Sequence, residues 1–179
     1  EHFSFDRTGS KSLEGVIHRL QGVSAYLDEL AFFDRLKAVR KAMDSFLSHV
    51  EIVSDRRPVN AGGVPAEWVT APGFDAKKRF LYIHGGAFCA GSPYSHRVIT
   101  SRLSEVTGCA VLAIDYRLMP EHKRIASVLD CRSAYNWILD YGPDDNDSEV
   151  ENVFVGGDSA GGNLTLSLIA WIRDSGGRA

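Results

Sequence analysis

The 179-residue chain lacks several features that would assign it to a specialised class of protein. It contains neither C-x-x-C nor H-E-x-x-H, and its three cysteines, Cys89, Cys109 and Cys131, cannot form a disulfide framework. No apolar run is long enough to span a bilayer. A formal charge of −3 gives no basic excess for nucleic acid or an anionic membrane. We therefore expect no metal, no cofactor, no nucleic-acid partner and no transmembrane segment, and the cysteine content favours a reducing, cytoplasmic location.

The composition is that of a globular protein, with 44% hydrophobic and 24% charged residues. From about Ser12 to Val50, apolar residues recur at spacings of three and four with one phase shift, which predicts two amphipathic helices. Pro58 and Gly62 then break any helix. We predict a helical segment over residues 1–50 and a different, second part over residues 51–179.

Short apolar strands alternate with helices in this second part. The predicted strands cover residues 66–70, 79–83, 109–114 and 150–155, and the predicted helices cover residues 95–107, 125–141 and 160–173. This alternation is typical of the α/β class, with a mostly parallel sheet, flanking helices and right-handed crossovers.

The strongest chemical signal is a G-x-S-x-G sequence at residues 157–161, between an apolar strand and a helix. Small flanking residues let such a turn close tightly, so that it holds the hydroxyl of Ser159 clear of the sheet. The helix that follows directs free N–H groups and its positive dipole end at the same place. We predict that Ser159 attacks a carbonyl carbon while the amide of Ala160 receives the developing negative charge.

A second glycine-rich turn, His84-Gly85-Gly86-Ala87-Phe88, follows another predicted strand. Consecutive small residues allow backbone amides to face a ligand with no side chain between, as an oxyanion loop requires. Two strand–helix steps separate this turn from Ser159, which places both turns at the edge where open α/β sheets bind ligands.

Together with residues 115–122, which read D-Y-R-L-M-P-E-H, these two turns resemble the hormone-sensitive-lipase family of α/β-hydrolase esterases. The resemblance covers about Val50 to Arg173, and the helical residues 1–50 resemble that family's cap segment more loosely. It implies that Ser159 forms an acyl-enzyme. It implies an oxyanion hole built from the amides of Gly85 or Gly86, of Ala87 and of Ala160. Ala87 stands where the family has a third glycine, and its methyl group can alter the loop or narrow the site.

The resemblance also implies residues that support the site. His84 would fix the oxyanion loop and would not act as the catalytic base. Further support would come from Asp158 and from a buried polar brace formed by Asp115, Tyr116, Arg117 and Glu121.

The chain departs from the hydrolase pattern after its serine. In this fold the order is Ser, then Asp or Glu, then His. All six histidines of this chain precede Ser159, and only Asp174 is acidic after it. A serine without a positioned base is a poor nucleophile. We therefore predict that residues 51–179 form the front half of an α/β-hydrolase core, incomplete without a second polypeptide segment that carries the catalytic Asp and His.

Three functions compete on this evidence. The first is a serine carboxylic ester hydrolase of lipid metabolism, acting on small to medium acyl esters in a pocket bounded by the helical cap. The second is a catalytically silent small-ligand receptor on the same fold, like the plant gibberellin receptors, which keep the serine block and lack a working histidine. The third, a free-standing scaffold, is disfavoured because an interrupted sheet would expose an edge strand and apolar surface.

Overall fold

The computed structural model describes residues 21–22, 24, 31–143 and 149–176. The chain forms two compact units, Glu1–Val39 and Arg40–Ala179, and the boundary expected at residue 50 stays a prediction. Helix α2 (Phe32–Phe46) crosses this division and confirms the later of the two predicted helices. Most of the earlier one lies outside the described residues.

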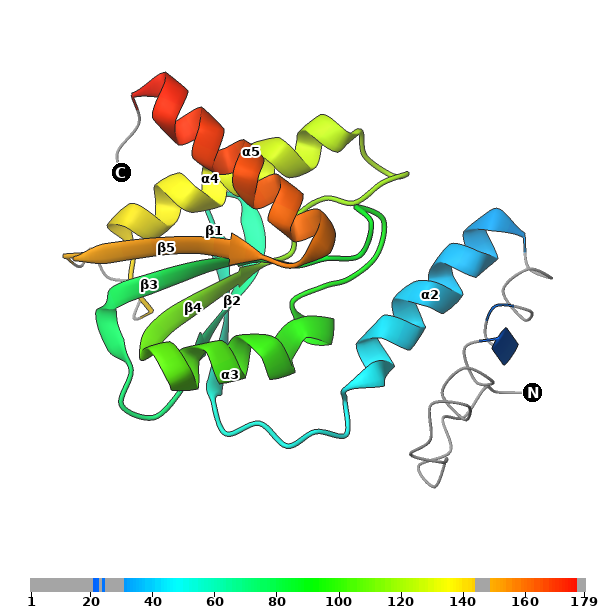
Figure 1. The fold of residues 1–179 in the computed structure, drawn as a ribbon, viewed down its shortest axis with the longest axis horizontal. Helices are drawn as coiled ribbons and strands as arrows, with labels where there is room; N and C mark the ends of the chain where they lie inside the picture. The colour runs from blue at the N-terminus through cyan, green and yellow to red at the C-terminus, as the bar shows by residue number, and fades with distance from the viewer. Residues whose placement is uncertain (1–20, 23, 25–30, 144–148, 177–179) are drawn as a thin grey trace. The chain divides into compact units, whose positions relative to one another are not determined.

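The second unit is built on a five-stranded sheet with the order β1-β2-β4-β3-β5 (Figure 1). The strands are β1 (Asp55–Ala61), β2 (Val64–Thr70), β3 (Asp75–Ile83), β4 (Cys109–Ile114) and β5 (Asn152–Gly157). The pairs β4–β3 and β3–β5 are parallel, whereas β1–β2 and β2–β4 are antiparallel. The sheet is therefore mixed, and its parallel part is the half that carries the two glycine-rich turns.

Strand β1 was not expected from the sequence. It forms a hairpin with β2 through Gly62 and Gly63, which both have positive φ angles of 64° and 95°. Two such residues favour the tight turn of a hairpin, and this turn makes the first pair antiparallel. Pro58 is tolerated within β1 because the strand lies at the edge of the sheet, where a missing N–H need not break a ladder hydrogen bond.

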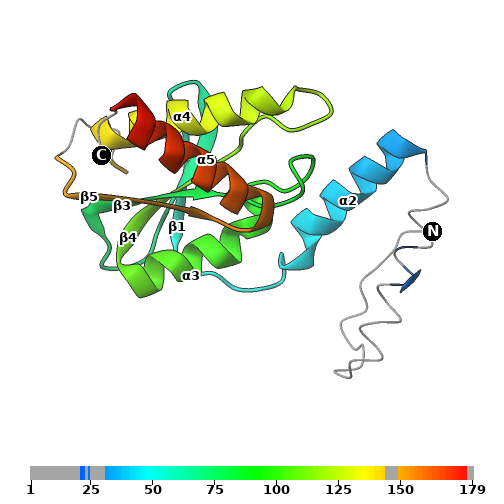
Figure 2. The ribbon, with the colours of Figure 1, turned by 45° about the horizontal axis from the view of Figure 1, so that its top comes forward.

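The helices cover both faces of the sheet. Helix α3 (Arg97–Thr107), which follows the short 3₁₀ helix η1 (Tyr94–His96), lies on one face, and α4 (Arg124–Asp140) and α5 (Ser159–Ser175) lie on the other (Figures 1 and 2). Every residue of β4 is buried between these layers, as its unbroken apolar sequence indicates. The predicted helices and the remaining strands are thus confirmed, with shifts of a few residues at their ends.

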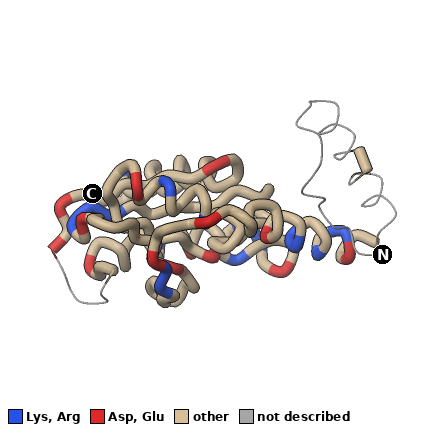
Figure 3. Tube along the Cα trace, turned by 90° about the horizontal axis from the view of Figure 1, so that it is seen from below, with Lys and Arg blue, Asp and Glu red and all other residues tan. Residues whose placement is uncertain are grey.

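Acidic and basic residues are both spread along the described chain (Figure 3), with a short basic run at Lys77, Lys78 and Arg79. This distribution agrees with the small net charge of −3. None of the described helices has both the length and the apolar character needed to cross a membrane.

Candidate active site

The two glycine-rich turns begin side by side. Ile83, the last residue of β3, pairs with Gly157, the last residue of β5, in the parallel ladder. The chain continues from these two residues into the turn that starts at His84 and into the turn that carries Ser159. Both turns therefore leave the sheet at the same edge, as expected from the sequence.

Ser159 lies on a sharp, strained turn. Its φ angle is 49°, in the left-handed region that non-glycine residues rarely adopt, and its side chain is exposed. The flanking glycines are required for steric reasons, because a Cβ atom at Gly157 or Gly161 would overlap the carbonyl oxygen of Ile83. This close approach of the turn to β3 explains why the serine stands between two glycines.

The start of α5 leaves one amide available beside the serine. The carbonyl oxygen of Asp158 accepts the amide hydrogens of Gly161 and Gly162 at 2.7 and 3.1 Å. Among the described residues, nothing accepts the amide hydrogen of Ala160. Its position in the first turn of the helix gives it the dipole environment that favours an anion.

The turn after β3 folds back on itself through left-handed residues. Gly86, Ala87 and Phe88 have φ angles of 121°, 54° and 62°. The carbonyl oxygen of Gly86 accepts the amides of Cys89 and Ala90 at 3.0 and 2.8 Å, while no described group accepts the amides of Gly86 and Ala87. The methyl group of Ala87 is exposed, so this loop accommodates the alanine that replaces the family's third glycine.

Gly85 differs from the other three expected donors. Its amide donates to Oδ1 of Asp158 at 2.9 Å, so it is already occupied in this structure. A Cβ atom at Gly85 would also overlap the Asp158 carboxylate. The amides that remain available to a ligand are those of Gly86, Ala87 and Ala160.

Asp158 holds a charge between the two turns. Its Oδ1 also accepts the hydroxyl hydrogen of Tyr82 at 2.8 Å and lies 3.5 Å from Nε2 of His96. Partial burial acts to raise the pKa of Asp158, but Tyr82, His96 and the amide of Gly85 outweigh it and lower that pKa below its usual range. Burial and the bond to Asp158 raise the pKa of Tyr82, which therefore keeps its hydrogen and donates it.

His84 lies beneath the loop as a neutral ring. It is 1% exposed, and its Nδ1 lies 2.7 Å from the carbonyl oxygen of Gly85, which can only accept a hydrogen. Burial lowers the pKa of His84 to about 4. Tyr116 stacks on the ring at 4.3 Å and donates its hydroxyl hydrogen to the carbonyl oxygen of His84 at 2.8 Å. Among the described residues, no histidine is hydrogen-bonded to Ser159.

The expected buried brace is only partly present. Tyr116 is buried, at 1% exposure, but the structure exposes Asp115, Arg117 and Glu121, and for these three the expectation is wrong. Two of them form ion pairs: Arg117 with Asp130 of α4 at 2.6 Å, and Glu121 with Arg40 at 2.7 Å. Asp130 is itself buried, at 6% exposure, whereas both side chains of the Glu121–Arg40 pair are partly exposed. The loop over residues 115–121 is therefore held by these two ion pairs around one buried tyrosine.

Known proteins share this fold. A family model described as the alpha/beta hydrolase fold matches residues 80–179, which is more than half of the chain. An esterase from the bacterial hormone-sensitive lipase (HSL) family superposes with a TM-score of 0.74 and 33% identity, over 94% of this chain and 55% of that one. The chain belongs to the hormone-sensitive-lipase family of α/β-hydrolases.

Curated relatives in this family include an acetyl-hydrolase from Streptomyces hygroscopicus and the carboxylic ester hydrolase LipN from Mycobacterium tuberculosis. The first is 39% identical over 118 residues, covering 66% of this chain and 38% of the relative. The second is 32% identical over 158 residues, covering 88% of this chain and 42% of the relative. The chain thus spans less than half the length of these two proteins.

One residue near the site was missed by sequence reasoning. In this family member, Nε of Arg40 donates to the carbonyl oxygen of Cys89 at 2.8 Å, and Nη2 donates to that of Met119 at 3.2 Å. The same guanidinium is bidentate to Glu121 at 2.7 and 2.9 Å. Arg40 therefore ties the oxyanion loop to the 115–121 loop. Its sequence context gives no signal, since its partners lie 49 to 81 residues away.

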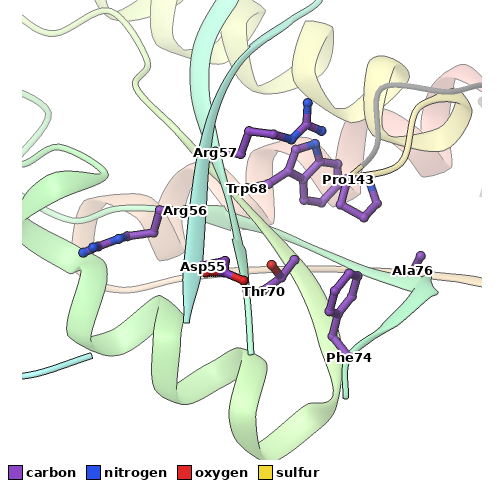
Figure 4. A pocket seen from close by; sticks show the side chains of 8 residues that line it. All are labelled: Asp55, Arg56, Arg57, Trp68, Thr70, Phe74, Ala76 and Pro143. Carbon is purple, nitrogen blue, oxygen red and sulfur yellow. The ribbon is translucent and has the colours of Figure 1, made fainter. Parts of the chain in front are cut away.

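A hollow of about 400 Å³ lies away from Ser159, beside the starts of β1 and β3 (Figure 4). Its lining residues are Asp55, Arg56, Arg57, Trp68, Thr70, Phe74, Ala76 and Pro143. Because parallel strands of an open sheet bind ligands at their carboxyl ends, this hollow at the amino end of β3 is separate from the candidate active site. No group of three or more metal-binding side chains occurs within the described part of the chain.

Proposed function

We propose that this chain supplies the nucleophile and the oxyanion hole of a serine carboxylic ester hydrolase that acts on small to medium acyl esters. The observation that carries the proposal is the exposed Ser159 on a strained turn, beside the available amides of Ala160, Gly86 and Ala87. The names of its relatives, an acetyl-hydrolase and a carboxylic ester hydrolase, support the same chemistry. The expected cytoplasmic location remains part of the proposal.

The proposed reaction has two steps. Oγ of Ser159 attacks the ester carbonyl carbon and gives its proton to a base, while the carbonyl oxygen becomes an oxyanion held by the three amides. The alcohol leaves with that proton, and an acyl-enzyme remains. Water then attacks the acyl carbon, the base takes a proton from the water and returns it to Ser159, and the acid is released.

The base and its acidic partner belong to a second polypeptide segment in this proposal. His84 cannot serve, because its ring is buried and neutral with Nδ1 bonded to the loop itself. Strand β5 is at the edge of the described sheet, and large apolar side chains are exposed on this strand and on the helix that follows it: Phe154 of β5 by 47%, and Leu166 and Ile169 of α5 by 68% and 47%. We propose that the segment with the catalytic Asp and His packs at this edge of the sheet and covers these apolar side chains.

Ester hydrolysis by the full protein tests this function. With p-nitrophenyl esters from acetate to octanoate, we expect turnover of the shorter esters and a loss of at least about 10⁴-fold in Ser159→Ala. Ser175→Ala, an exposed serine at the end of the same helix, is the matched control and keeps full turnover. Unchanged turnover in Ser159→Ala would overturn the proposal. A folded protein that binds a small ligand yet never turns over an ester would favour the receptor alternative.

The second segment is tested separately by mass spectrometry on the active preparation. We expect a polypeptide that carries a histidine beyond these 179 residues. If the only polypeptide present is residues 1–179 and it hydrolyses an activated ester at enzyme-like rates, the second-segment proposal is wrong.

A further inference from the structure

We infer that His96 is a positioning residue of this site: it holds the Asp158 carboxylate, which in turn fixes the oxyanion loop against the turn that carries Ser159. The inference rests on the proposed function and adds to it a residue that touches neither the substrate nor the serine. Three groups converge on the Asp158 carboxylate: the hydroxyl of Tyr82, the ring of His96 and the amide of Gly85.

The bond between Asp158 and Gly85 sets the spacing of the two turns. Asp158 directly precedes Ser159, and Gly85 directly precedes the first available amide, that of Gly86. Their 2.9 Å hydrogen bond therefore joins the nucleophile turn to the oxyanion loop within one residue of the reacting groups. A shift of the Asp158 carboxylate changes the distance between Ser159 and the loop amides.

His96 is buried beside this carboxylate at 6% exposure. Its Nε2 lies 3.5 Å from Oδ1 of Asp158, a distance for charge attraction and not for a short hydrogen bond. A bare Nε2 at this place would set its lone pair against a carboxylate oxygen. The arrangement therefore favours the forms of His96 that carry a hydrogen on Nε2.

The other ring nitrogen is satisfied by the turn that ends the oxyanion loop. Nδ1 of His96 lies 2.9 Å from Oγ of Ser95 and 3.1 Å from the carbonyl oxygen of Ser92. If the Ser95 hydroxyl donates to Nδ1, the single hydrogen of the neutral ring is on Nε2; if Nδ1 donates to Ser92, Nε2 carries a hydrogen only in the doubly protonated ring. The approach of Nε2 to Asp158 favours these two forms. His96 thus connects the far end of the loop, at Ser92, with Asp158 at the nucleophile turn.

The surroundings of His96 leave it little freedom to move. The ring of Tyr82, on β3, and the ring of His84, which directly follows β3, lie 6.1 and 5.4 Å from its ring. Ser92, which Nδ1 approaches, is itself held by a 2.7 Å hydrogen bond from its Oγ to Asp44. A histidine fixed on all these sides is suited to keep the carboxylate in one place, as a preorganised oxyanion hole requires.

The test compares two substitutions in the full protein. His96→Leu removes both polar contacts, and we expect kcat to fall about 10- to 100-fold with KM changed less than about threefold, because loop amides move from their place in the transition state. His96→Gln keeps an N–H donor that can face Asp158, and we expect it to recover most of kcat. His49→Gln, at an exposed histidine, is the control and leaves both constants unchanged.

A spectroscopic measurement on the unsubstituted protein accompanies the kinetics. The ¹⁵N shift of His96 Nε2 should be that of a protonated nitrogen at neutral pH, and it should move in Asp158→Asn. A bare Nε2, full kcat in His96→Leu, or an equal loss in the Gln and Leu variants would each overturn the inference. If the protein turns over no ester and a fluorophosphonate does not label Ser159, the proposed function fails first, and this inference fails with it.

Discussion

Ile83 and Gly157 are direct partners in the parallel ladder between β3 and β5, and each is the last residue of its strand. Because neighbouring parallel strands run in the same direction, the chain leaves both residues at one edge of the sheet. This single pairing brings Ser159 to the oxyanion loop, although the two turns are far apart in the sequence. The close approach is preserved by glycine at positions 157 and 161.

This close approach gives a prediction about stability. In Gly161→Ala the added Cβ would overlap the backbone carbonyl oxygens of Ile83 and His84, which cannot move without distorting the end of β3 and the start of the turn after it. We expect the free energy of unfolding to fall by at least about 2 kcal/mol. Urea denaturation measures the change. In the control, Gly162→Ala, the new Cβ would lie 3.3 Å from its nearest neighbour, the carbonyl oxygen of Gly157, and we expect a loss below about 1 kcal/mol. Equal losses in the two variants would contradict this reading.

The buried ring of His84 predicts a dependence of stability on pH. Burial lowers its pKa from 6.5 to about 4 in the folded protein. The unfolded chain therefore binds more protons between these two values, so the stability contribution is complete above pH 6.5 and is lost as the pH falls toward 4. The shift corresponds to about 3 kcal/mol across this window. Chemical denaturation at pH 7 and pH 4.5 measures this change. Between these two pH values, the free energy of unfolding should fall less in His84→Asn than in the unsubstituted protein. Parallel slopes would show that other groups cause the loss.

The contacts of Arg40 predict that a lysine at this position gives a less stable protein. Its guanidinium holds Glu121 in a bidentate pair and two backbone carbonyl oxygens at once, which a lysine ammonium cannot reproduce. The pair is 29% and 48% exposed, so solvent weakens it, and we expect Arg40→Lys to cost about 1 kcal/mol of the free energy of unfolding. Lys37→Met, at a largely exposed position of the same helix, is the control. Chemical denaturation that finds Arg40→Lys as stable as the unsubstituted protein would contradict a clamping role.

The Arg40 pair also holds a carboxylate in its charged form. The hydrogen bond from Arg40 is the main cause that lowers the pKa of Glu121 to about 2. Because this pKa lies below that of the unfolded chain, the contribution of the pair is present above about pH 4.5 and is lost as the pH falls toward 2. In Arg40→Lys, we expect the Glu121 carboxyl, followed by ¹³C NMR, to titrate at a higher pH than in the unsubstituted protein.

The parts of the fold that the sequence predicts well are those controlled by local pattern. The continuous apolar run of β4 and the strand–turn–helix around Ser159 depend on neighbours in the sequence, and both appear where expected. Strand β1 was missed because Pro58 normally breaks a strand. Only its place at the sheet edge, a tertiary property, makes the proline acceptable.

In the candidate site, too, local pattern is predictable from the sequence and long-range contacts are not. The glycines around Ser159 are recognised from the G-x-S-x-G pattern, whereas Arg40 and His96 act through partners that are distant in the sequence. The resemblance of residues 115–122 to the family suggested a buried brace, yet burial is decided by the surrounding chain, and of the four brace residues only Tyr116 is buried. The hydrogen bond from the Gly85 amide to Asp158 could not be predicted from the sequence either. A motif identifies possible donors, but it does not show which of them already have an acceptor in the folded protein.

The most direct test of the account is the site of covalent labelling by a fluorophosphonate in the full, folded protein. The reagent forms a bond to a serine Oγ only where that oxygen is activated and amide hydrogens stabilise the phosphonyl oxygen. The account predicts one adduct per protein, mapped by peptide mass spectrometry to Ser159 and absent in Ser159→Ala. An adduct on a different serine, or folded protein that stays unlabelled, would contradict it.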